Sequence, residues 1–275
     1  MRLPAPIRLM LAAGAVLAGA APVLAGAGPN RLSDSELEAE AARQFAEMKA
    51  SMPLLTDRET IDYIACVANA VVQVLEPEYR DLPWEMAIFE DKSVNAFAMP
   101  GGKIGVMQGI LKAATNQHQL AAVIGHEIAH VTAKHSNERA NRSKVSGVGI
   151  QVAAVLLGGG NRGATYTAYE ALNQGVPLLV MLPFSRKQES EADVIGLEYM
   201  ARAGFDPRQA VPLWQNMLKE GDKAPSEFLS THPSGEKRID SLISQWSKTL
   251  PIYNEALQAG RQPNCIAPQQ PEQPQ

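Results

Sequence analysis

The sequence predicts an α+β fold that is mostly helical and has one small β-sheet. Apolar residues recur at helical spacing in several long segments, and two short extended segments flank Pro100-Gly101-Gly102 as the arms of a hairpin. The chain has 275 residues, and we find no internal repeat in it. We therefore expect one compact domain, which we assign to residues 26–261.

The first half of this domain is expected to hold two helices and the strands. Ser33-Asp34-Ser35-Glu36 is a capping box, and the helix that it opens continues to Met52. Apolar residues three or four positions apart give residues 58–75 one buried helical face. The expected strands are residues 86–89, Ala96–Met99 and Lys103–Met107.

The second half of the domain is expected to be helical. Asn116 caps a long helix, a further helix covers residues 186–203, and Asp206-Pro207 opens the next one. The last expected helix covers residues 234–246. Residues 139–169 contain no Asp or Glu and are rich in Gly and Ala, so we expect a buried helix followed by a mobile loop there.

The N-terminus has the pattern of a signal peptide. Arg2 and Arg8 are followed by an apolar run that ends in small residues at Ala25, so we expect residues 1–25 to be removed on export. The alternative is an uncleaved membrane anchor, but the run is short and is interrupted by Gly and Pro. Later apolar segments are also too short to cross a bilayer, so we expect a soluble mature chain with no integral span.

Composition restricts the partners and the compartment. The formal net charge is -4 at pH 7, which argues against nucleic acid as a partner. Residues 262–275 are rich in Pro and Gln and are expected to form a disordered tail. In an exported protein the isolated pair Cys66 and Cys265 is expected to form one disulfide, the alternative being two unpaired thiols.

The segment His126-Glu127-Ile128-Ala129-His130 has the pattern of a metal-binding helix. Two histidines four positions apart lie about 40° apart around a helix and roughly 6 Å apart along it, so both imidazoles can bind one metal ion. Glu127 lies beside that site, where it can take a proton from a zinc-bound water. The alternative is a helix with two surface histidines that have other hydrogen-bond partners. The pattern favours a zinc site with its own general base.

A catalytic zinc ion needs a third protein ligand. The metzincin arrangement is excluded, because it would have Gly at position 133 and His at position 136, where this chain has Ala133 and Ser136. His135 would lie about 180° around the helix from His126. We therefore expect His135 to be solvated or to cap the helix.

Acidic residues supply the remaining candidates for the third ligand. Glu189 and Asp193 are four positions apart, so one helical face presents both. One of them can bind zinc while the other hydrogen-bonds a ligand histidine. The alternative is a solvated face paired with neighbouring Arg and Lys side chains. The full set of candidates is Glu170, Glu189, Glu191, Asp193 and Glu198.

Four motifs, in order, resemble the CaaX-prenyl-protease/HtpX family of zinc metallopeptidases (peptidase family M48), over residues 31–248. The family implies a zincin-like metallopeptidase domain whose small sheet lies beside the HExxH helix, with one zinc ion per chain. The motifs are Asn95-Ala96-Phe97 with Pro100-Gly101-Gly102, the HEIAH segment 126–130, residues 185–193 (SRKQESEAD), and Ser230-Thr231-His232-Pro233 with Arg238-Ile239.

The resemblance also implies roles for single side chains. Glu189 is implied as the third zinc ligand beside His126 and His130, the gluzincin arrangement, and Asp193 as the supporting acid. His232 is implied to approach the metal and to act as a latch at its open position. The alternative for His232 is that it caps the following helix or hydrogen-bonds locally.

The chain looks like the exported, soluble branch of the family typified by BepA and LoiP, without the tetratricopeptide domain of BepA-like members. This implies a periplasmic zinc endopeptidase that hydrolyses misfolded or unassembled envelope proteins, with peripheral membrane attachment left open. The expected partners are such polypeptides and the outer-membrane assembly machinery. Asn95, Ala96 and Phe97 would bind substrate as an added β-strand. The alternatives are a chaperone-like binding protein using the same groove with little or no turnover, and a structural zinc protein.

Overall fold

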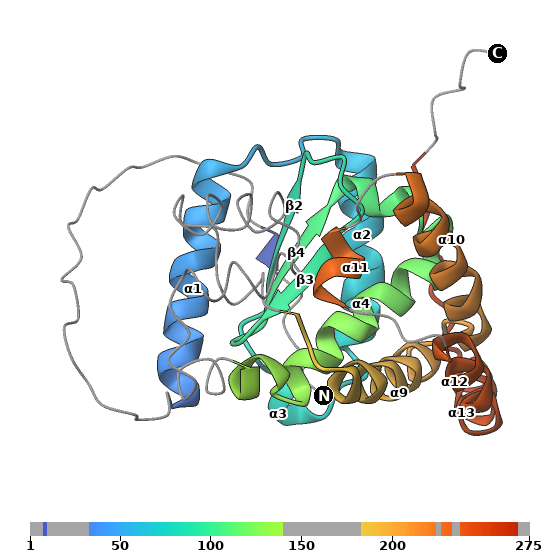
Figure 1. Cartoon of the computed structure of the whole chain (residues 1–275). Coiled ribbons are helices and arrows are strands. Elements are labelled where there is room, and N and C mark those ends of the chain that lie inside the picture. The colour runs from blue at the N-terminus through green and yellow to red at the C-terminus, as the bar shows by residue number, and fades with distance from the viewer. Residues whose placement is uncertain (1–7, 10–32, 140–182, 224–226, 233–236, 269–275) are drawn as a thin grey trace, which may run out of the picture.

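The computed structural model describes residues 8–9, 33–139, 183–223, 227–232 and 237–268 of the chain. Most of the expected signal peptide therefore lies outside the described residues. The expected buried helix and loop at 139–169 lie outside them as well, apart from Arg139. The fold class is confirmed, because the described residues are mostly helical and contain one small sheet (Figure 1).

The sheet has the strand order β1-β2-β4-β3. β3 and β4 are the antiparallel arms of the expected hairpin, and β2 pairs with β4 in parallel. Gly101 and Gly102 in the turn both have φ of 75°, a conformation that glycine adopts without strain. The edge formed by β3 faces α4 (Figure 1). The strands are β1 (Arg8–Leu9), β2 (Glu85–Phe89), β3 (Ala96–Met99) and β4 (Lys103–Met107).

The helices begin close to where capping residues predict. Ser33 forms the expected capping box with Glu36, and the Asn116 side chain accepts hydrogen bonds from two backbone N–H groups at the start of α4. The α-helices whose two ends both lie in the described residues are α1 (Asp34–Ser51), α2 (Arg58–Val72), α3 (Pro77–Arg80), α4 (Gln117–Thr132), α9 (Arg186–Arg202), α10 (Ala210–Lys223), α11 (Glu227–Thr231), α12 (Arg238–Ser244) and α13 (Trp246–Gln258), with 3-10 turns at Gln108–Lys112 and Pro207–Gln209.

Different helices cover the two faces of the sheet. On one face, Phe45 of α1 packs with Phe89 and Phe97. On the opposite face, Ile88 and Ile104 join the main core, to which α2 and α4 also contribute. Side chains alternate between the faces of a strand, so both faces of this short sheet are buried and its strands are largely apolar.

The prediction for the C-terminal helices was partly wrong. Instead of one last helix over residues 234–246, the structure has α12 from Arg238 and then α13, which ends at Gln258. Pro251 lies inside α13. Proline normally ends or kinks a helix because it lacks the N–H donor. Pro251 therefore argued against a helix in this segment.

The structure joins Cys66 of α2 to Cys265 in a disulfide, with Cα atoms 5.7 Å apart. The backbone N–H of Cys265 also donates to Gln117 at the start of α4. The Arg261 side chain donates to the carbonyl of Arg202 at the end of α9. The segment after α13 thus runs back against helices from the centre of the chain. Of the expected tail, residues 269–275 lie outside the described part.

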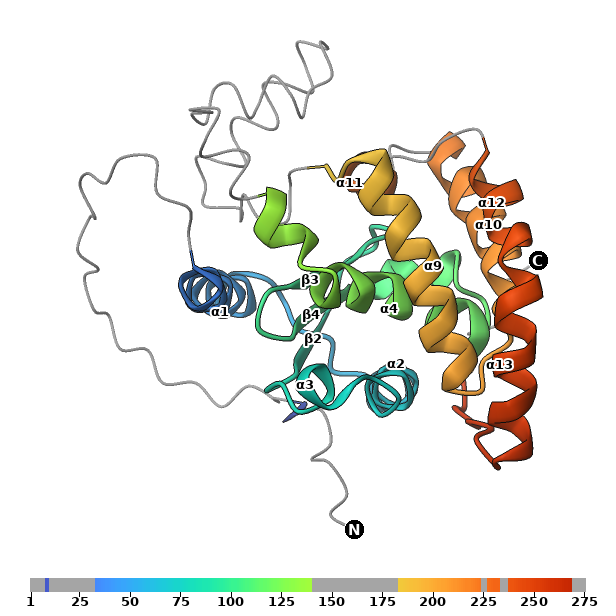
Figure 2. The ribbon, with the colours of Figure 1, turned by 90° about the horizontal axis from the view of Figure 1, so that it is seen from below.

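α4 is the central helix, and most of its residues are buried. It lies between the sheet and α9, and the two helices cross closely (Figure 2). A Cβ atom added to Gly125 of α4 would lie 2.9 Å from the carbonyl oxygen of Gly196 in α9. The two backbones therefore touch where a side chain would keep them apart. Among the helices that the structure describes, none is both long and apolar enough to span a membrane.

Replacing Gly196 by Ala is expected to push α9 away from α4, because the new Cβ would lie 2.8 Å from the backbone nitrogen of His126. We expect a loss of about 1–3 kcal/mol in the free energy of unfolding, as in other overpacked cores. Zinc binding should weaken too, because the expected ligands His126 and Glu189 lie on different helices. Urea unfolding and zinc titration measure the two effects. Ser190→Ala, at an exposed position of α9, is the matched control and should change neither quantity.

Candidate metal centre

His126 and His130 of α4 point to a common centre. Their Nε2 atoms lie 3.1 Å apart, and both side chains are buried. The i, i+4 spacing on a helix produces this convergence, as the sequence predicts. Gly125, next to His126, lets α9 approach closely enough for its side chains to reach the same centre.

Glu189 and His232 complete a buried group of four donors. From the first turn of α9, Glu189 places Oε2 3.4 Å from His126 Nε2 and Oε1 3.3 Å from His130 Nε2. His232, which follows α11, places Nδ1 3.2 Å from His126 Nε2 and 3.0 Å from Glu189 Oε1. The four ligand atoms all lie within 4.8 Å of one another.

The donor group fits one tetrahedral metal ion. For metal–ligand bonds of about 2.0 Å, neighbouring ligands of a tetrahedron are roughly 3.3 Å apart, close to the spacings found here. The electrostatics agree, because Glu189 and Asp193 raise the pKa of His126 to about 9 against the opposing effect of burial. Burial alone would raise the pKa of Glu189, but His232 and His126 hold it well below its usual range. The cluster thus attracts positive charge into a buried space.

Glu127 lies between this group and strand β3. Its Oε2 accepts a hydrogen bond of 3.2 Å from the backbone N–H of Ala98, and its Oε1 lies 3.4 Å from Nε2 of His232. This buried Oε1 accepts no hydrogen bond within the part of the chain that the structure describes. Burial also raises the pKa of Glu127 above its usual value. A fixed carboxylate with one oxygen that accepts no hydrogen bond can take up and return a proton.

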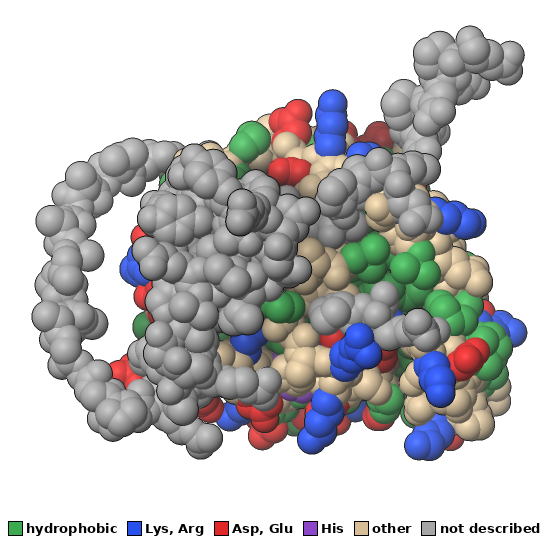
Figure 3. Space-filling model, viewed as in Figure 1, with side chains coloured by type: hydrophobic (Ala, Val, Ile, Leu, Met, Phe, Trp, Pro, Cys, Tyr) green, Lys and Arg blue, Asp and Glu red, His purple; other side chains and the backbone are tan. Residues whose placement is uncertain are grey.

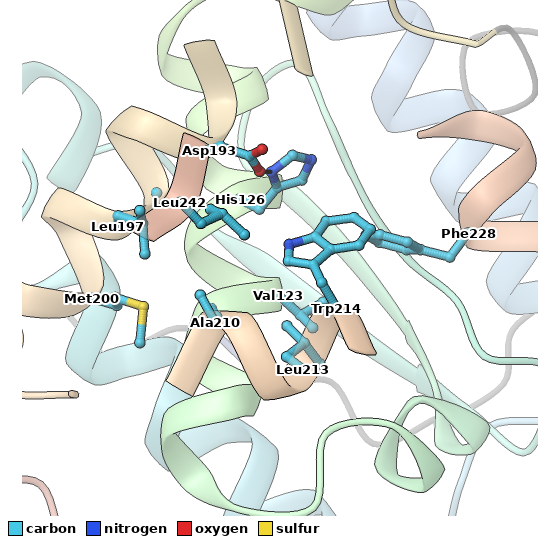
Figure 4. Close-up of a pocket in the computed structure, with 12 residues that line it drawn as sticks. Val123, His126, Asp193, Leu197, Met200, Ala210, Leu213, Trp214, Phe228 and Leu242 are labelled. Carbon is cyan, nitrogen blue, oxygen red and sulfur yellow. Dashed lines mark ion pairs between the residues drawn. The ribbon is translucent and has the colours of Figure 1, made fainter. Parts of the chain in front are cut away.

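Asp193 and Arg238 support the group from the side of α9 and α12. Asp193 lies 3.0 Å from Nδ1 of His126, where the family resemblance places the supporting acid (Figure 4). The guanidinium of Arg238 donates to Glu189 Oε2 at 3.0 Å and to Asp193 Oδ1 at 2.6 Å. Its Cζ lies 3.3 Å over the ring of Trp214. One buried cation therefore holds both carboxylates in place.

An apolar pocket borders the same residues. Figure 4 shows the ring of His126 and the carboxylate of Asp193 at one end, with Trp214 and Phe228 beside them. Leu213 of α10 lines the pocket further from the site. The ring of Phe228 stacks on His232 at a centroid distance of 4.4 Å. These contacts fix the imidazole planes and shield the donor group from water.

His135 contradicts its expected solvated or capping position. It is 2% exposed, and its Nδ1 lies 3.0 Å from Nδ1 of His130. The projection around a straight helix fails because α4 ends at Thr132 and Lys134 takes a left-handed conformation with φ of 56°. The chain turns there, and the turn brings the His135 ring against His130.

The three residues proposed to bind substrate do not contact Glu127 themselves, but the next part of their strand does. β3 begins at Ala96, and it is Ala98 that contacts Glu127. Phe97 packs on the opposite face, toward α1, and Asn95 is buried just before the strand.

The sequence pattern gave no role to Arg238, although this residue lies in one of the motifs. It also missed Phe184, whose ring stacks on His130 at 3.7 Å and which no motif marks.

Comparison with known proteins agrees with this geometry. The sequence profile of peptidase family M48 matches residues 59–245. The chain is a member of peptidase family M48. This family of metallopeptidases includes relatives that are named metalloendopeptidases, in keeping with the buried His-His-Glu-His group found here.

Family M48 relatives of this chain come from mitochondria and from bacteria. The chain is 37% identical over 195 residues to mitochondrial metalloendopeptidase OMA1 of Schizosaccharomyces pombe, covering 70% of this chain and 55% of the relative. It is 37% identical over 183 residues to the Arabidopsis thaliana OMA1, covering 66% and 35%. It is 29% identical over 213 residues to the beta-barrel assembly-enhancing protease of Escherichia coli O157:H7, covering 75% and 43%. The chain thus spans about half the length of the relatives it matches.

Replacing Arg238 by Met should leave two buried carboxylates without their cation. We expect a loss of roughly 3–5 kcal/mol in the free energy of unfolding, the usual effect of breaking a buried ion pair, and weaker metal binding through Glu189. Lys should not restore either property, because an ammonium cannot reproduce the two-pronged contact. The matched control is Arg208→Met, which removes an exposed guanidinium paired with the partly buried Asp206 and should change stability by less than about 1 kcal/mol. Denaturant unfolding and zinc titration measure the outcome, and a Lys variant that behaves as wild type would contradict this role.

Proposed function

We propose that this protein is a zinc-dependent endopeptidase that hydrolyses peptide bonds in misfolded or unassembled cell-envelope proteins. The observation that carries the proposal is the convergence of His126, His130 and Glu189 on one centre, beside a Glu127 oxygen that accepts no hydrogen bond from the described residues. We assign these three side chains as the zinc ligands, the gluzincin arrangement, with one zinc ion per chain. When bound there, zinc lowers the pKa of a coordinated water and polarises the scissile carbonyl.

Glu127 is the general base and acid of this reaction. Its Oε1 accepts the proton that the attacking water loses, and it then delivers that proton to the leaving amine. The hydrogen bond from Ala98 holds the other oxygen, so the carboxylate keeps its orientation through both transfers. Burial raises the pKa of Glu127, which makes this carboxylate a stronger base than an exposed one.

Strand β3 is proposed to bind the substrate backbone. The carbonyl of Asn95 accepts from the N–H of Met107, so in an antiparallel pair the backbone groups of Ala96 and Ala98 turn away from β4. The N–H of Ala98 donates to Glu127, which leaves the backbone groups of Ala96 and the carbonyl of Ala98 for a substrate. An extended substrate could pair with that edge through main-chain hydrogen bonds, which would tolerate many sequences. The helices beyond the site also expose apolar side chains, Leu218 of α10 and Ile243 of α12 among them. Figure 3 shows hydrophobic side chains on the side of the molecule where these helices lie. Such surface suits unfolded polypeptides.

His232 is proposed to be a latch. Nδ1 of His232 lies among the four donor atoms, and a zinc ion held by all four would have no position free for water, which a catalytic site needs. His232 must therefore withdraw before hydrolysis. It follows a five-residue helix, α11, and the ring of Phe228 on that same helix stacks on its imidazole as an anchor. The latch and its anchor can thus move together.

The proposed compartment is the periplasm. The pattern of residues 1–25 supports export, and the Cys66–Cys265 disulfide suits an oxidising compartment. We propose residues 26–261 as one metallopeptidase domain and residues 262–275 as a tail. The name of the bacterial relatives points to β-barrel proteins, so we propose unassembled barrels as substrates and their assembly machinery as a partner.

Replacing Glu127 by Gln should abolish hydrolysis while zinc remains bound, because the amide cannot take the water proton. We expect a fall of roughly 100- to 10,000-fold in kcat. Casein and an unfolded β-barrel protein serve as substrates, and metal analysis gives the zinc content. Glu198→Gln, at an exposed position of α9, is the control. If the Gln variant cleaves like wild type, the assignment is wrong. If the wild type cleaves neither substrate but suppresses their aggregation, the chaperone-like function replaces this proposal.

Replacing His232 by Ala should raise peptidase activity several-fold, because the fourth position becomes open to water. Zinc should remain bound through three ligands, with weaker affinity. Initial rates on casein and zinc competition with a chelator measure both properties. Phe228→Leu should act in the same direction, because it removes the ring that stacks on the imidazole. A His232→Ala variant that keeps its zinc and hydrolyses casein at or below the wild-type rate would contradict the latch.

A further inference from the structure

A third histidine of the α4 region lies behind His130, on the side away from the donor group. The Nδ1 atoms of His130 and His135 are 3.0 Å apart. On the far side of its ring, Nε2 of His135 lies 3.5 Å from Oε2 of Glu191. Glu191 reaches the surface, with half of its side chain exposed. The three side chains form a continuous chain from the donor group to solvent.

The backbone adopts a strained conformation to place His135 there. Lys134 has φ of 56°, and it is the one non-glycine residue with positive φ in the described part of the chain. Such a conformation costs roughly 1–2 kcal/mol for a side chain other than Asn, Asp or Gly. Asp34 at the start of α1 holds the turn, because its two carboxylate oxygens accept from Lys134 Nζ at 2.6 Å and from Asn137 Nδ2 at 2.7 Å. Strain that neighbouring contacts maintain is a common sign of function.

The hydrogen-bond pattern assigns the proton on each ring. Nε2 of His130 faces His126 and Glu189, so it must keep its lone pair free to bind a metal. Its proton is then on Nδ1, which donates to Nδ1 of His135. The proton of His135 is in turn on Nε2, which faces the carboxylate of Glu191. In this arrangement Nδ1 of His130 donates to an acceptor and Nε2 of His135 lies beside a carboxylate, so neither of these two rings needs a charge.

We propose that His135 is a positioning residue for the metal centre, with Glu191 as its outer partner. By accepting the Nδ1 proton of His130, His135 fixes the tautomer and the ring plane that present Nε2 to the metal. The carboxylate of Glu191 makes His135 a better acceptor. This proposal rests on the proposed function in so far as the centre binds zinc through His130. A carboxylate or carbonyl usually accepts the second N–H of a metal-binding histidine, and here an imidazole takes that place.

A purely structural role for His135 would have a different signature. As a core side chain, it would stabilise the fold through packing near Phe184, whose ring centroid is 6.4 Å away. Any apolar residue of similar volume would then serve as well. As a positioning residue, it needs an acceptor atom at the place of Nδ1. His135→Leu removes that atom, whereas His135→Asn keeps an acceptor, Oδ1, at the same distance along the side chain.

The test is zinc affinity, measured by competition with a chelator, together with nitrogen NMR of the histidine rings. We expect His135→Leu to weaken zinc binding roughly 10- to 100-fold, the usual effect of removing such a partner, and His135→Asn to recover most of the loss. In the wild type, NMR should show the proton of His130 on Nδ1. Glu191→Ala should weaken binding in the same direction, and Glu198→Ala, equally exposed on α9, should not.

Several results would overturn the positioning role. These are a Leu variant with wild-type affinity, an Asn variant as weak as the Leu variant, or a His130 proton on Nε2. If His135→Leu does not fold, the positioning role is still tested by NMR of the wild type and by the two variants at exposed glutamates. Zinc affinity does not depend on hydrolysis, so a wild type that binds zinc but cleaves nothing would refute the proposed function and leave this test valid.

Discussion

The contact between the backbones of α4 and α9 is the constraint on which the site depends. Gly125 and Gly196 meet without side chains, and His126 follows directly on α4. Only at this separation can Glu189 of α9 reach two imidazoles that project from α4. The buried apolar residues around the crossing hold the helices together, but the two glycines set how near they come.

The same packing also buries several ionisable groups close together, away from solvent. Glu127 and Glu189 are buried within the same group, and Asp193 joins them at its edge. Three imidazoles and the guanidinium of Arg238 face them. Burying charges is costly unless each finds a partner of opposite sign, and Arg238 supplies part of that compensation. A bound cation would supply the rest, which links the stability of the core to the occupancy of the site.

Local patterns in the sequence predicted much of the fold. Ser33 and Asn116 cap helices through side chains only a few residues away, and the hairpin depends on Gly101 and Gly102 in its own turn. Features that depend on contacts between distant segments were harder to predict from the sequence. α13 contains Pro251, whose cost is met by packing that a local pattern does not contain. The helices of the second half are therefore the least well predicted part.

The metal centre shows the same contrast between residues placed by local geometry and residues placed by distant contacts. His126 and His130 converge because helix geometry alone brings them together, and the family motif pointed to Glu189 and His232, which the structure places beside them. His135 was misplaced because its position depends on a left-handed turn at Lys134, held by a contact with α1 about one hundred positions earlier. Arg238 was seen as part of a motif, but its two carboxylate partners became evident only from the packing of α12 on α9.

The disulfide between α2 and the C-terminal segment has a topological consequence. The bonded cysteines are separated by 199 positions, and the helices and loops that supply every donor of the centre lie between them. A single cut anywhere between Cys66 and Cys265, including a cut that the protein makes in its own chain, would leave two fragments that are still covalently joined. In an oxidising compartment a nicked molecule would therefore keep its donors tethered, and it would separate into fragments only after reduction.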